Sequence, residues 1–356
     1  MAFNPAVSDE PPSHQPVSFA AKADLCESDI FARHLQHGLL IPQVVDPTGA
    51  LLYTHDNCGL RTGVMLSALS LKWSVTREPE ARARAAQTAA ALRMLETVTG
   101  VPGMTARQYK KMQGPGHDEH PSWLSRQWHQ GPVYRWLGNV STDEMTWFLA
   151  GLADYVLLCA EGRERARSVA TINRVVGRML DHGMRIVEAD GRTTTWGDCS
   201  RESAREPLFC LHGLHYLKVA EVCTDNPRFA AAYEEYASDA HYLEQAVHCY
   251  KLGRAKRCWA DYDWELATPG FDFLLRHDSD PARRDLLTQG LLEMAAAPNA
   301  NLHPHLCTAT FGLGGKEQVR EWLAQFDPQT ADGVSKGWYH WIYWEARSAG
   351  IITPTD

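Results

Sequence analysis

Hydrophobic and polar positions along this chain alternate between two kinds of predicted helix. Residues 59–77 are apolar around most of the helical circumference, whereas residues 80–98 carry one charged face. An apolar helix is buried on all sides, and an amphipathic helix keeps one face in solvent. Pro79 lies near the first turn of the second helix, where its missing N–H costs least. The pattern therefore predicts a helical hairpin with one buried and one half-exposed member.

The same couplet recurs along the chain, which predicts an all-α fold. Its apolar and amphipathic members pair as 142–160 with 163–184, 208–223 with 227–247, and 260–276 with 280–297. Further helices are expected at 23–39, 302–313, 316–327 and 337–348, for a total of about twelve. A short strand pair is expected at 185–196, because Asp190-Gly191 suits a hairpin turn.

Helical hairpins of this kind predict two concentric rings, with the apolar helices inside and the amphipathic helices outside. Six hairpins make an (α/α)6 toroid, which is the predicted fold, with a small β-hairpin in one loop. The joints at Pro79, Gly162, Pro227 and Pro281 are unequally spaced, which disfavours a solenoid with a fixed short repeat. An open α-solenoid is the alternative.

Composition and charge narrow the possible partners. The chain has 356 residues, of which 44% are hydrophobic, enough for a large core. We expect a flexible Pro- and Ser-rich leader at 1–20 and a single toroid domain at 21–350. A net charge of −8 without a basic run disfavours nucleic acid. No segment has the roughly 18 consecutive apolar residues of a membrane span, so no membrane partner is expected.

Cysteine usage predicts a cytoplasmic protein. The nine cysteines are an odd number, and none has the C-x-x-C spacing. Cys159, Cys210 and Cys223 lie within apolar helical stretches, so we expect small buried hydrophobes in a reducing compartment. The chain has no Walker loop, no G-x-S-x-G elbow and no Gly-rich fingerprint after a strand, and we expect no cofactor.

The candidate chemistry lies in long loops that precede the apolar helices. These loops hold most of the unusual polar and aromatic residues, and they span 40–58, 100–141, 185–207, 248–259 and 298–301. Loops of this length in a compact domain are usually functional. In a toroid they would all lie at one end, around a central funnel.

The first cluster runs from His55 to Gly63. Asp56 or Asn57 caps the following helix in one interpretation. A cap does not explain Arg61, one turn into a buried helix, since a buried guanidinium needs a carboxylate or a bound anion. A helix cap and a pocket lining are equally good interpretations of this cluster.

The second cluster joins Arg135 and Trp136 to the acids at the start of an apolar helix. Ser141-x-x-Glu144 has the pattern of a capping box, which would give Glu144 a structural role. Asp143 is not needed for that box and is our first candidate for a catalytic acid or base. To act as an acid it needs a raised pKa, supplied by burial or by a second carboxylate such as Asp56.

Three further groups supply candidates for substrate binding. Trp196 could stack on a sugar ring and Asp198 could hydrogen-bond to it, although a buried Trp that closes the hairpin explains the pattern equally well. Asp261 opens another apolar helix. An aromatic stripe from Trp338 to Trp344 mainly predicts closure of the toroid, though Trp338 or His340 could reach the funnel.

Histidines are a separate set of candidates. His212 and His215 lie one turn apart on an apolar helix, a spacing that can bind metal, but no H-E-x-x-H pattern is present. His303 lies in a similarly loose pair. Because single histidines are more often core or loop residues than ligands, we predict no metal. His212 is a candidate general base, and His215 and His303 are candidates for substrate binding.

As a set, four motifs resemble a group of poorly characterised bacterial helical-toroid proteins. They are Asp56-Asn57-x-Gly59-x-Arg61-Thr62-Gly63, Thr99-Gly100-x-Pro102-Gly103-x-x-Ala106-Arg107, Tyr134-Arg135-Trp136-x-Gly138-x-x-Ser141-x-Asp143-Glu144, and Thr194-Thr195-Trp196-Gly197. The chain is similar to the six-hairpin glycosidase-like superfamily over roughly residues 45–300. The motifs are specific for the fold group and weak for an activity.

The resemblance implies a function by position. Unsaturated glucuronyl hydrolases of that superfamily use acids at the amino ends of inner helices, and Asp56 and Asp143 have comparable positions. The histidine-rich middle and the short last third depart from the sugar-processing pattern. Our leading hypothesis is a hydrolase or lyase for a small polar, sugar-derived substrate. Arg61 and Arg135 would bind an anionic or hydroxylated group of it, and Trp136 and Trp196 would stack on its ring. The alternatives are an eliminase, isomerase or cyclase for a non-sugar metabolite with a histidine base, and a non-catalytic toroid that binds a small molecule.

Overall fold

The computed structural model describes residues 17–41, 43–45, 51–54, 56–111, 128–203, 206–252 and 261–356. Side chains are described for all of these except 43–45, 51–54, Ser203, Leu252, Asp261 and Tyr262. The described part of the chain is mostly helical, which confirms the predicted all-α class. None of its helices is both long enough and apolar enough to span a membrane.

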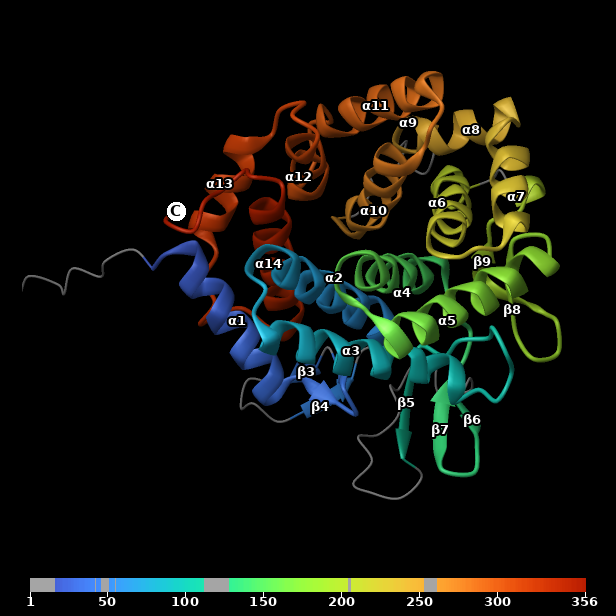
Figure 1. Ribbon diagram of the computed structural model, residues 1–356, viewed down its shortest axis with the longest axis horizontal. Helices are drawn as coiled ribbons and strands as arrows, with labels where there is room; N and C mark the ends of the chain where they lie inside the picture. Colours follow the sequence, from blue (N-terminus) through green and yellow to red (C-terminus); the bar gives the residue numbers. More distant parts are fainter. Residues whose placement is uncertain are drawn as a thin grey trace, which may run out of the picture.

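The apolar helices occupy the interior of the molecule (Figure 1). They are α2 (Cys58–Thr76), α4 (Thr142–Asp154), α6 (Pro207–Cys223), α10 (Asp261–His277), α12 (Leu302–Thr310) and α14 (Gly333–Ser348). In this order each helix packs against the next, and α14 packs in turn against α2. A π-helical turn, η2 (Tyr155–Cys159), continues α4. We call these six the interior helices.

The amphipathic helices lie outside them in Figure 1. They are α1 (Phe19–Arg33), α3 (Pro79–Thr97), α5 (Gly162–Asp181), α7 (Pro227–Ala237), α8 (Ala240–Val247), α11 (Pro281–Ala295) and α13 (Lys316–Gln325). One helix was predicted over 227–247, but the structure has two, because the Asp239 side chain accepts hydrogen bonds from the backbone N–H groups of His241 and Tyr242 and so starts a new helix. Short helices α9 (Cys249–Leu252) and η3 (Arg201–Ser203) lie in the connections.

The described strands are short and form small antiparallel sheets. The predicted pair at 185–196 is present as β8 (Arg185–Val187) and β9 (Thr193–Asp198). The sequence analysis missed β1 (Leu35–Gln36) with β2 (Leu39–Leu40), β3 (Gln43–Val45) with β4 (Leu51–Thr54), and the sheet of β5 (Gln108–Lys111), β7 (Tyr134–Leu137) and β6 (Trp128–Gln130), in that order. The helix expected at 23–39 ends at Arg33, because His37 and Gly38 take left-handed backbone angles and turn the chain into β2.

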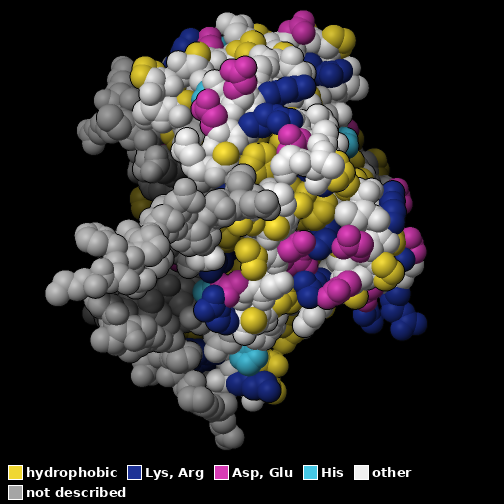
Figure 2. Space-filling model, turned by 90° about the vertical axis from the view of Figure 1, so that its left-hand side faces the viewer, with side chains coloured by type: hydrophobic (Ala, Val, Ile, Leu, Met, Phe, Trp, Pro, Cys, Tyr) yellow, Lys and Arg dark blue, Asp and Glu magenta, His cyan; other side chains and the backbone are white. Residues whose placement is uncertain are grey.

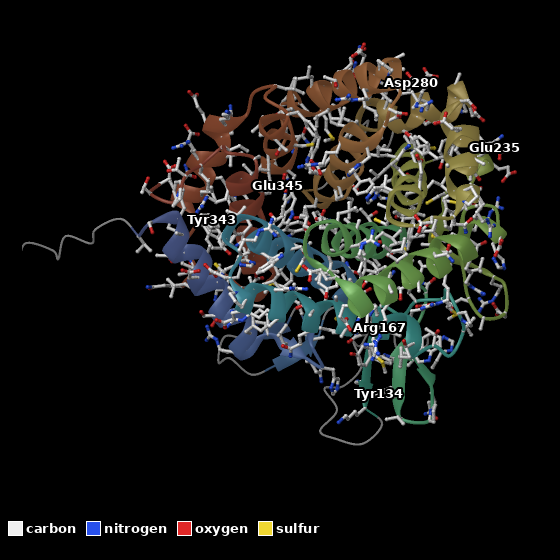
Figure 3. All side chains as sticks on the ribbon, viewed as in Figure 1. Tyr134, Arg167, Glu235, Asp280, Tyr343 and Glu345 are labelled. Atoms are coloured by element: carbon white, nitrogen blue, oxygen red, sulfur yellow. The ribbon has the colours of Figure 1, made fainter. Side chains whose placement is uncertain are left out.

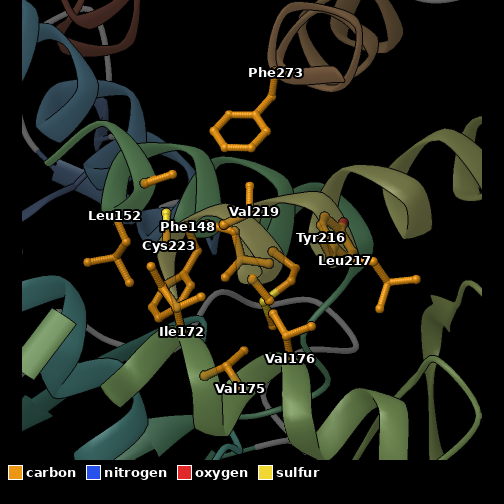
Figure 4. Packing of buried hydrophobic residues seen from close by; sticks show 14 of the residues in the cluster. Phe148, Leu152, Ile172, Val175, Val176, Tyr216, Leu217, Val219, Cys223 and Phe273 are labelled. Atoms are coloured by element: carbon orange, nitrogen blue, oxygen red, sulfur yellow. The ribbon is translucent and has the colours of Figure 1, made fainter. Parts of the chain in front are cut away.

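The largest hydrophobic core lies between interior and outer helices. Figure 4 shows Phe148 of α4, Ile172 and Val176 of α5, and Tyr216 of α6, all of them buried. The cysteines described by the structure are buried and free, as predicted for small hydrophobes. On the face shown in Figure 2, basic and acidic side chains are interspersed.

A buried carboxylate ties the first and last helices together. Glu27 of α1 accepts hydrogen bonds from Lys72 of α2 at 2.8 Å and from Arg84 of α3 at 2.6 Å. His340 Nε2 of α14 lies 3.1 Å from the same carboxylate. Burial alone would raise the pKa of Glu27, but the hydrogen bonds from His340 and Lys72 hold it well below its usual range. His340 therefore has a structural role and does not reach a funnel.

Helices α2 and α4 approach each other through two glycines. A Cβ atom at Gly63 would overlap the carbonyl oxygen of Trp147, and a Cβ atom at Gly151 would overlap that of Gly63. Any side chain at either position must therefore push two backbones apart. Because α2 packs against α4, α3 and α14, such a shift would spread through the interior.

We expect Gly63→Ala to lower the free energy of unfolding by about 1–3 kcal/mol, the usual cost of overpacking a well-packed interior. Gly177→Ala in α5 is the matched control, because its added methyl group would meet only Phe229 Cζ at 3.9 Å. The control should be neutral or stabilising, since Ala favours a helix by about 1 kcal/mol over Gly. Urea denaturation measures both, and equal stability of the two variants would contradict this account.

Candidate functional site

Six residues near the amino ends of the interior helices form what we call the amino-end cluster. One comes from each interior helix, and together they are Arg61, Asp143, His212, Glu265, His303 and Trp338. Arg61 contacts Glu265 and Trp338, and its charge acts on His303, which packs against Trp338. The charge of Asp143 acts on His212. The structure thus places Arg61 beside His303 and Asp143 beside His212 among the predicted site residues, and it adds Glu265.

Arg61 is the central cation of this cluster. Its side chain is 16% exposed, and its Nη1 donates a hydrogen bond to Glu265 Oε2 at 3.3 Å. The guanidinium carbon lies 5.4 Å from the centre of the Trp338 ring. Arg61 Nε and Trp338 Nε1 are buried and have no hydrogen-bond partner among the described residues. A buried donor left unpaired costs about 1–3 kcal/mol, so both N–H groups favour a ligand that carries acceptor oxygens.

A proline fixes the position of Glu265. Pro269 lies inside α10 and has no N–H, so the carbonyl of Glu265, four residues earlier, lacks its helical donor. Trp147 Nε1 of α4 donates to this carbonyl at 3.1 Å instead. The backbone that carries the carboxylate is therefore held from a neighbouring helix.

His303 is a neutral imidazole within the cluster. Burial, and then the positive charge of Arg61, lower the pKa of His303 to about 3. Its Nδ1 lies 3.3 Å from Asn301 Oδ1, an acceptor, so Nδ1 carries the proton. Nε2 is then an acceptor, and it has no partner among the described residues.

His212 and His215 are buried, neutral side chains on α6. His212 Nε2 lies 3.2 Å from the Leu266 carbonyl oxygen and must donate to it, which leaves Nδ1 as an unpartnered acceptor. Burial lowers the pKa of His212 to about 4 and that of His215 to about 3. His215 packs against Tyr216 and Phe273. Within the described residues, no group of three His, Cys, Asp or Glu side chains could hold a metal ion.

The two predicted catalytic acids lie near a third acid. Asp143 is half-buried, and its charge acts on His212 and Tyr216 of α6. Asp56 Oδ2 accepts a hydrogen bond from Arg107 Nη1 at 3.1 Å. Both carboxylates raise the pKa of Glu144. The partner carboxylate proposed for Asp143 is thus paired with Arg107, a residue whose role the sequence analysis missed.

Glu144 has a different structural role from the predicted one. Its carboxyl accepts a hydrogen bond from the backbone N–H of Leu60 at 2.9 Å, and it lies against Gly59, where a Cβ atom would overlap it. The predicted capping box with Ser141 is wrong, because the Ser141 side chain caps no N–H and Glu144 faces α2 instead. Burial raises the pKa of Glu144 well above its usual range, although Arg107 opposes the shift. The folded protein therefore holds a proton on this carboxyl at pH values where the unfolded chain has already released it.

The remaining candidates lie in the small sheets or outside the described part. Trp136 is buried and stacks on His129 at 4.1 Å, so its ring is already covered. Arg135 lies over Trp128, with 5.0 Å between its guanidinium carbon and the ring centre. Trp196 is 43% exposed on β9, which contradicts its interpretation as a buried Trp.

Two more candidates complete the predicted set. Asp198 forms an ion pair with Arg185 of β8 at 3.3 Å. The side chain of Asp261 lies outside the described residues, as does His55. For Glu265, the sequence did hold a signal: a proline four residues later inside an apolar helix releases a carbonyl that another group must bind.

Comparison with known proteins assigns no relative to this geometry. No family model, no curated protein and no solved structure matches the chain. The function of the protein must therefore be inferred from the side chains of the amino-end cluster.

We expect Glu144→Gln to keep nearly native stability and Glu144→Ala to lose about 1–3 kcal/mol, because only Gln preserves the acceptor for the buried Leu60 N–H. The folded wild type retains a proton that the unfolded chain releases above the ordinary carboxyl pKa of 4.5. Wild-type stability should therefore fall relative to Glu144→Gln as the pH rises above that value. Urea denaturation across this pH range measures both effects. Equal losses in the two variants would contradict the acceptor role of Glu144, and a pH-independent difference between the wild type and Glu144→Gln would contradict its raised pKa.

Proposed function

We propose that the interior and outer helices form an (α/α)6 toroid whose central funnel opens at the amino ends of the interior helices. Three observations support this arrangement. Apolar and amphipathic helices alternate along the chain, each interior helix packs against the next, and α14 packs against α2. An open solenoid would leave its first and last repeats apart.

We further propose that the protein is a hydrolase or lyase for a small polar, sugar-derived substrate. One observation carries this proposal: Arg61 and Trp338 each hold a buried, unpartnered N–H, and Arg61 contacts both the Trp338 ring and the Glu265 carboxylate near the amino ends of different interior helices. Two donors and an acid in one partly buried cluster favour a ligand rich in hydroxyl or carboxylate oxygens.

Three members of the cluster and Asp56 have roles in this proposal. Asp143 acts as the general acid or base, and Asp56 is its partner carboxylate. Arg61 binds an anionic or hydroxylated group of the substrate, since its guanidinium retains one unpaired donor. The neutral ring of His303 offers an acceptor to a substrate hydroxyl. Proton transfer from a positioned carboxyl contributes about 10²–10⁴-fold to the rate of such reactions.

One observation favours a second candidate function. The unpartnered Nδ1 of His212 is a buried base next to Asp143, which suits an eliminase, isomerase or cyclase that acts on a non-sugar metabolite. Its pKa of about 4 predicts an activity that falls with acidification near pH 4. An activity that persists in His212→Gln and is lost in Asp143→Asn would exclude this alternative.

We expect Asp143→Asn to lower kcat by at least about 10²-fold. The melting temperature should stay nearly unchanged, because Asp143 is half-buried and its side chain forms no hydrogen bond or ion pair among the described residues. Turnover would be measured on a panel of unsaturated uronides and glycosides that first identifies a wild-type substrate. Asp225→Asn, at an exposed position between α6 and α7, is the control. Full activity of Asp143→Asn would remove the central assignment. Wild-type binding without turnover would support a non-catalytic protein.

We expect Arg61→Gln to raise KM for substrates with a carboxylate by about ten- to a hundredfold and to affect neutral substrates less, since a charged hydrogen bond is worth about 1.5–3 kcal/mol. Arg167→Gln, at an exposed position of α5 labelled in Figure 3, is the matched control. The comparison of charged with neutral substrates separates binding from a general loss of structure. An equal rise for both substrate classes would contradict the role of Arg61.

A further inference from the structure

A second candidate site lies toward the carboxyl ends of the interior helices, away from the amino-end cluster. There a cavity of about 260 Å³ is lined by residues of α2, α4, α10, α12 and α14. One water molecule needs only about 10–15 Å³ of such space, so the cavity has room for a small organic molecule. Figure 3 shows one of its lining residues, Glu345, in the interior, whereas Glu235 and Asp280 lie at the periphery.

The polar side of this cavity has more carboxyl groups than cations. Arg276 donates hydrogen bonds to Asp272 at 2.8 Å and to Glu345 at 2.7 Å. Asp154, at the junction of α4 with the π-helical turn η2, accepts a hydrogen bond from Ser67 at 2.5 Å. Three carboxyl groups thus face one guanidinium, and Arg276 is already occupied by two of them.

Burial and this excess of carboxyl groups raise the pKa of two of the acids. Burial, and then the charge of Asp272, raise the pKa of Asp154 to about 6. Burial, with Asp272 and Asp154, raises the pKa of Glu345 to about 7, against the opposing effect of Arg276. Unpaired buried carboxylates are costly, and protonation lowers that cost.

The other wall of the cavity is apolar. Trp147, Phe273 and Trp341 contribute buried rings, and Leu157 lies at 39% exposure on the same lining. The thiol of Cys307 is buried there too. The cavity therefore combines an acidic side with an aromatic side, which suits a molecule that has a charged end and an aliphatic body.

We propose that this cavity binds a small organic cation, with ammonium groups on a short aliphatic chain, held by the Asp154 and Glu345 carboxylates against the aromatic wall. An anion is disfavoured because Arg276 is occupied by carboxylates. A metal ion is disfavoured because no described group of three ligands could hold one. The cavity shares an aromatic wall with the amino-end cluster, because its lining residues Trp147 and Trp341 contact Trp338 and His303. Its carboxyl groups, however, have no role in the proposed reaction, so this inference does not depend on the proposed function.

Isothermal titration calorimetry with 1,4-diaminobutane tests the proposal directly, and 1,4-butanediol is the neutral control of the same length. We expect the diamine to bind and the diol not to bind at physiological salt. Because a bound cation favours the ionised carboxyls, binding should release protons, detected as a dependence of the heat on the buffer. The affinity should rise between about pH 5 and pH 8 and then level off, because the pKa values of Asp154 and Glu345 are about 6 and 7. His277 and Cys307 are the other titratable groups in the lining besides Asp272 and Arg276. Equal binding of diol and diamine, or no binding of either, would overturn the proposal.

Variants locate the binding. Asp154→Asn should weaken diamine binding by about tenfold or more, while its amide oxygen still accepts the Ser67 hydrogen bond. Asp285→Asn, an exposed position of α11 with the same change in charge, should bind as the wild type does. Thermal melting verifies that both variants fold. Unchanged affinity in a folded Asp154→Asn would overturn the assignment. Arg61→Gln and Asp143→Asn should bind the diamine normally, so this test succeeds or fails independently of the proposed function.

Discussion

The contact between α2 and α4, made without side chains at Gly63 and Gly151, is the constraint on which both candidate sites depend. On one side of it, the Leu60 N–H meets the Glu144 carboxyl, and Arg61 and Asp143 lie within a turn of this bond. On the other side, the Ser67 hydroxyl donates a hydrogen bond to the Asp154 carboxyl. One close approach of two backbones therefore sets the position of an acid at each end of the pair.

The sequence predicts the helices well because their hydrophobic period is strong and their ends carry chemical signals. Pro79, Pro227 and Pro281 begin outer helices in the structure, as expected from proline at a first turn. The sheet of β5, β7 and β6 was missed because its strands are short and their side chains do not alternate between buried and exposed: Gln108, Tyr109 and Lys110 are all buried. Period-two patterning fails in such strands.

The candidate site was predicted only in part. Arg61 was expected to need a carboxylate, and Glu265 supplies it from α10, far away in sequence. The raised pKa of Glu144 follows from its burial against Gly59 and Leu60, which no local sequence pattern indicates. Asp154 and Glu345 each lie among apolar residues near the end of an interior helix, where no motif marks them. Their significance emerges only when the helices are placed side by side and the two carboxyls share a cavity.

The Glu27 carboxylate has a consequence for how the chain folds. Its partners Lys72 and Arg84 lie nearby in sequence, but His340 belongs to the last interior helix. During synthesis, α1 to α3 would leave the ribosome long before α14 exists to complete their interface. Pairings so distant in sequence slow folding, because the entropy of closing a large loop is lost before the contact forms. The early helices thus expose apolar surface for most of translation, a period in which chaperone binding would protect them.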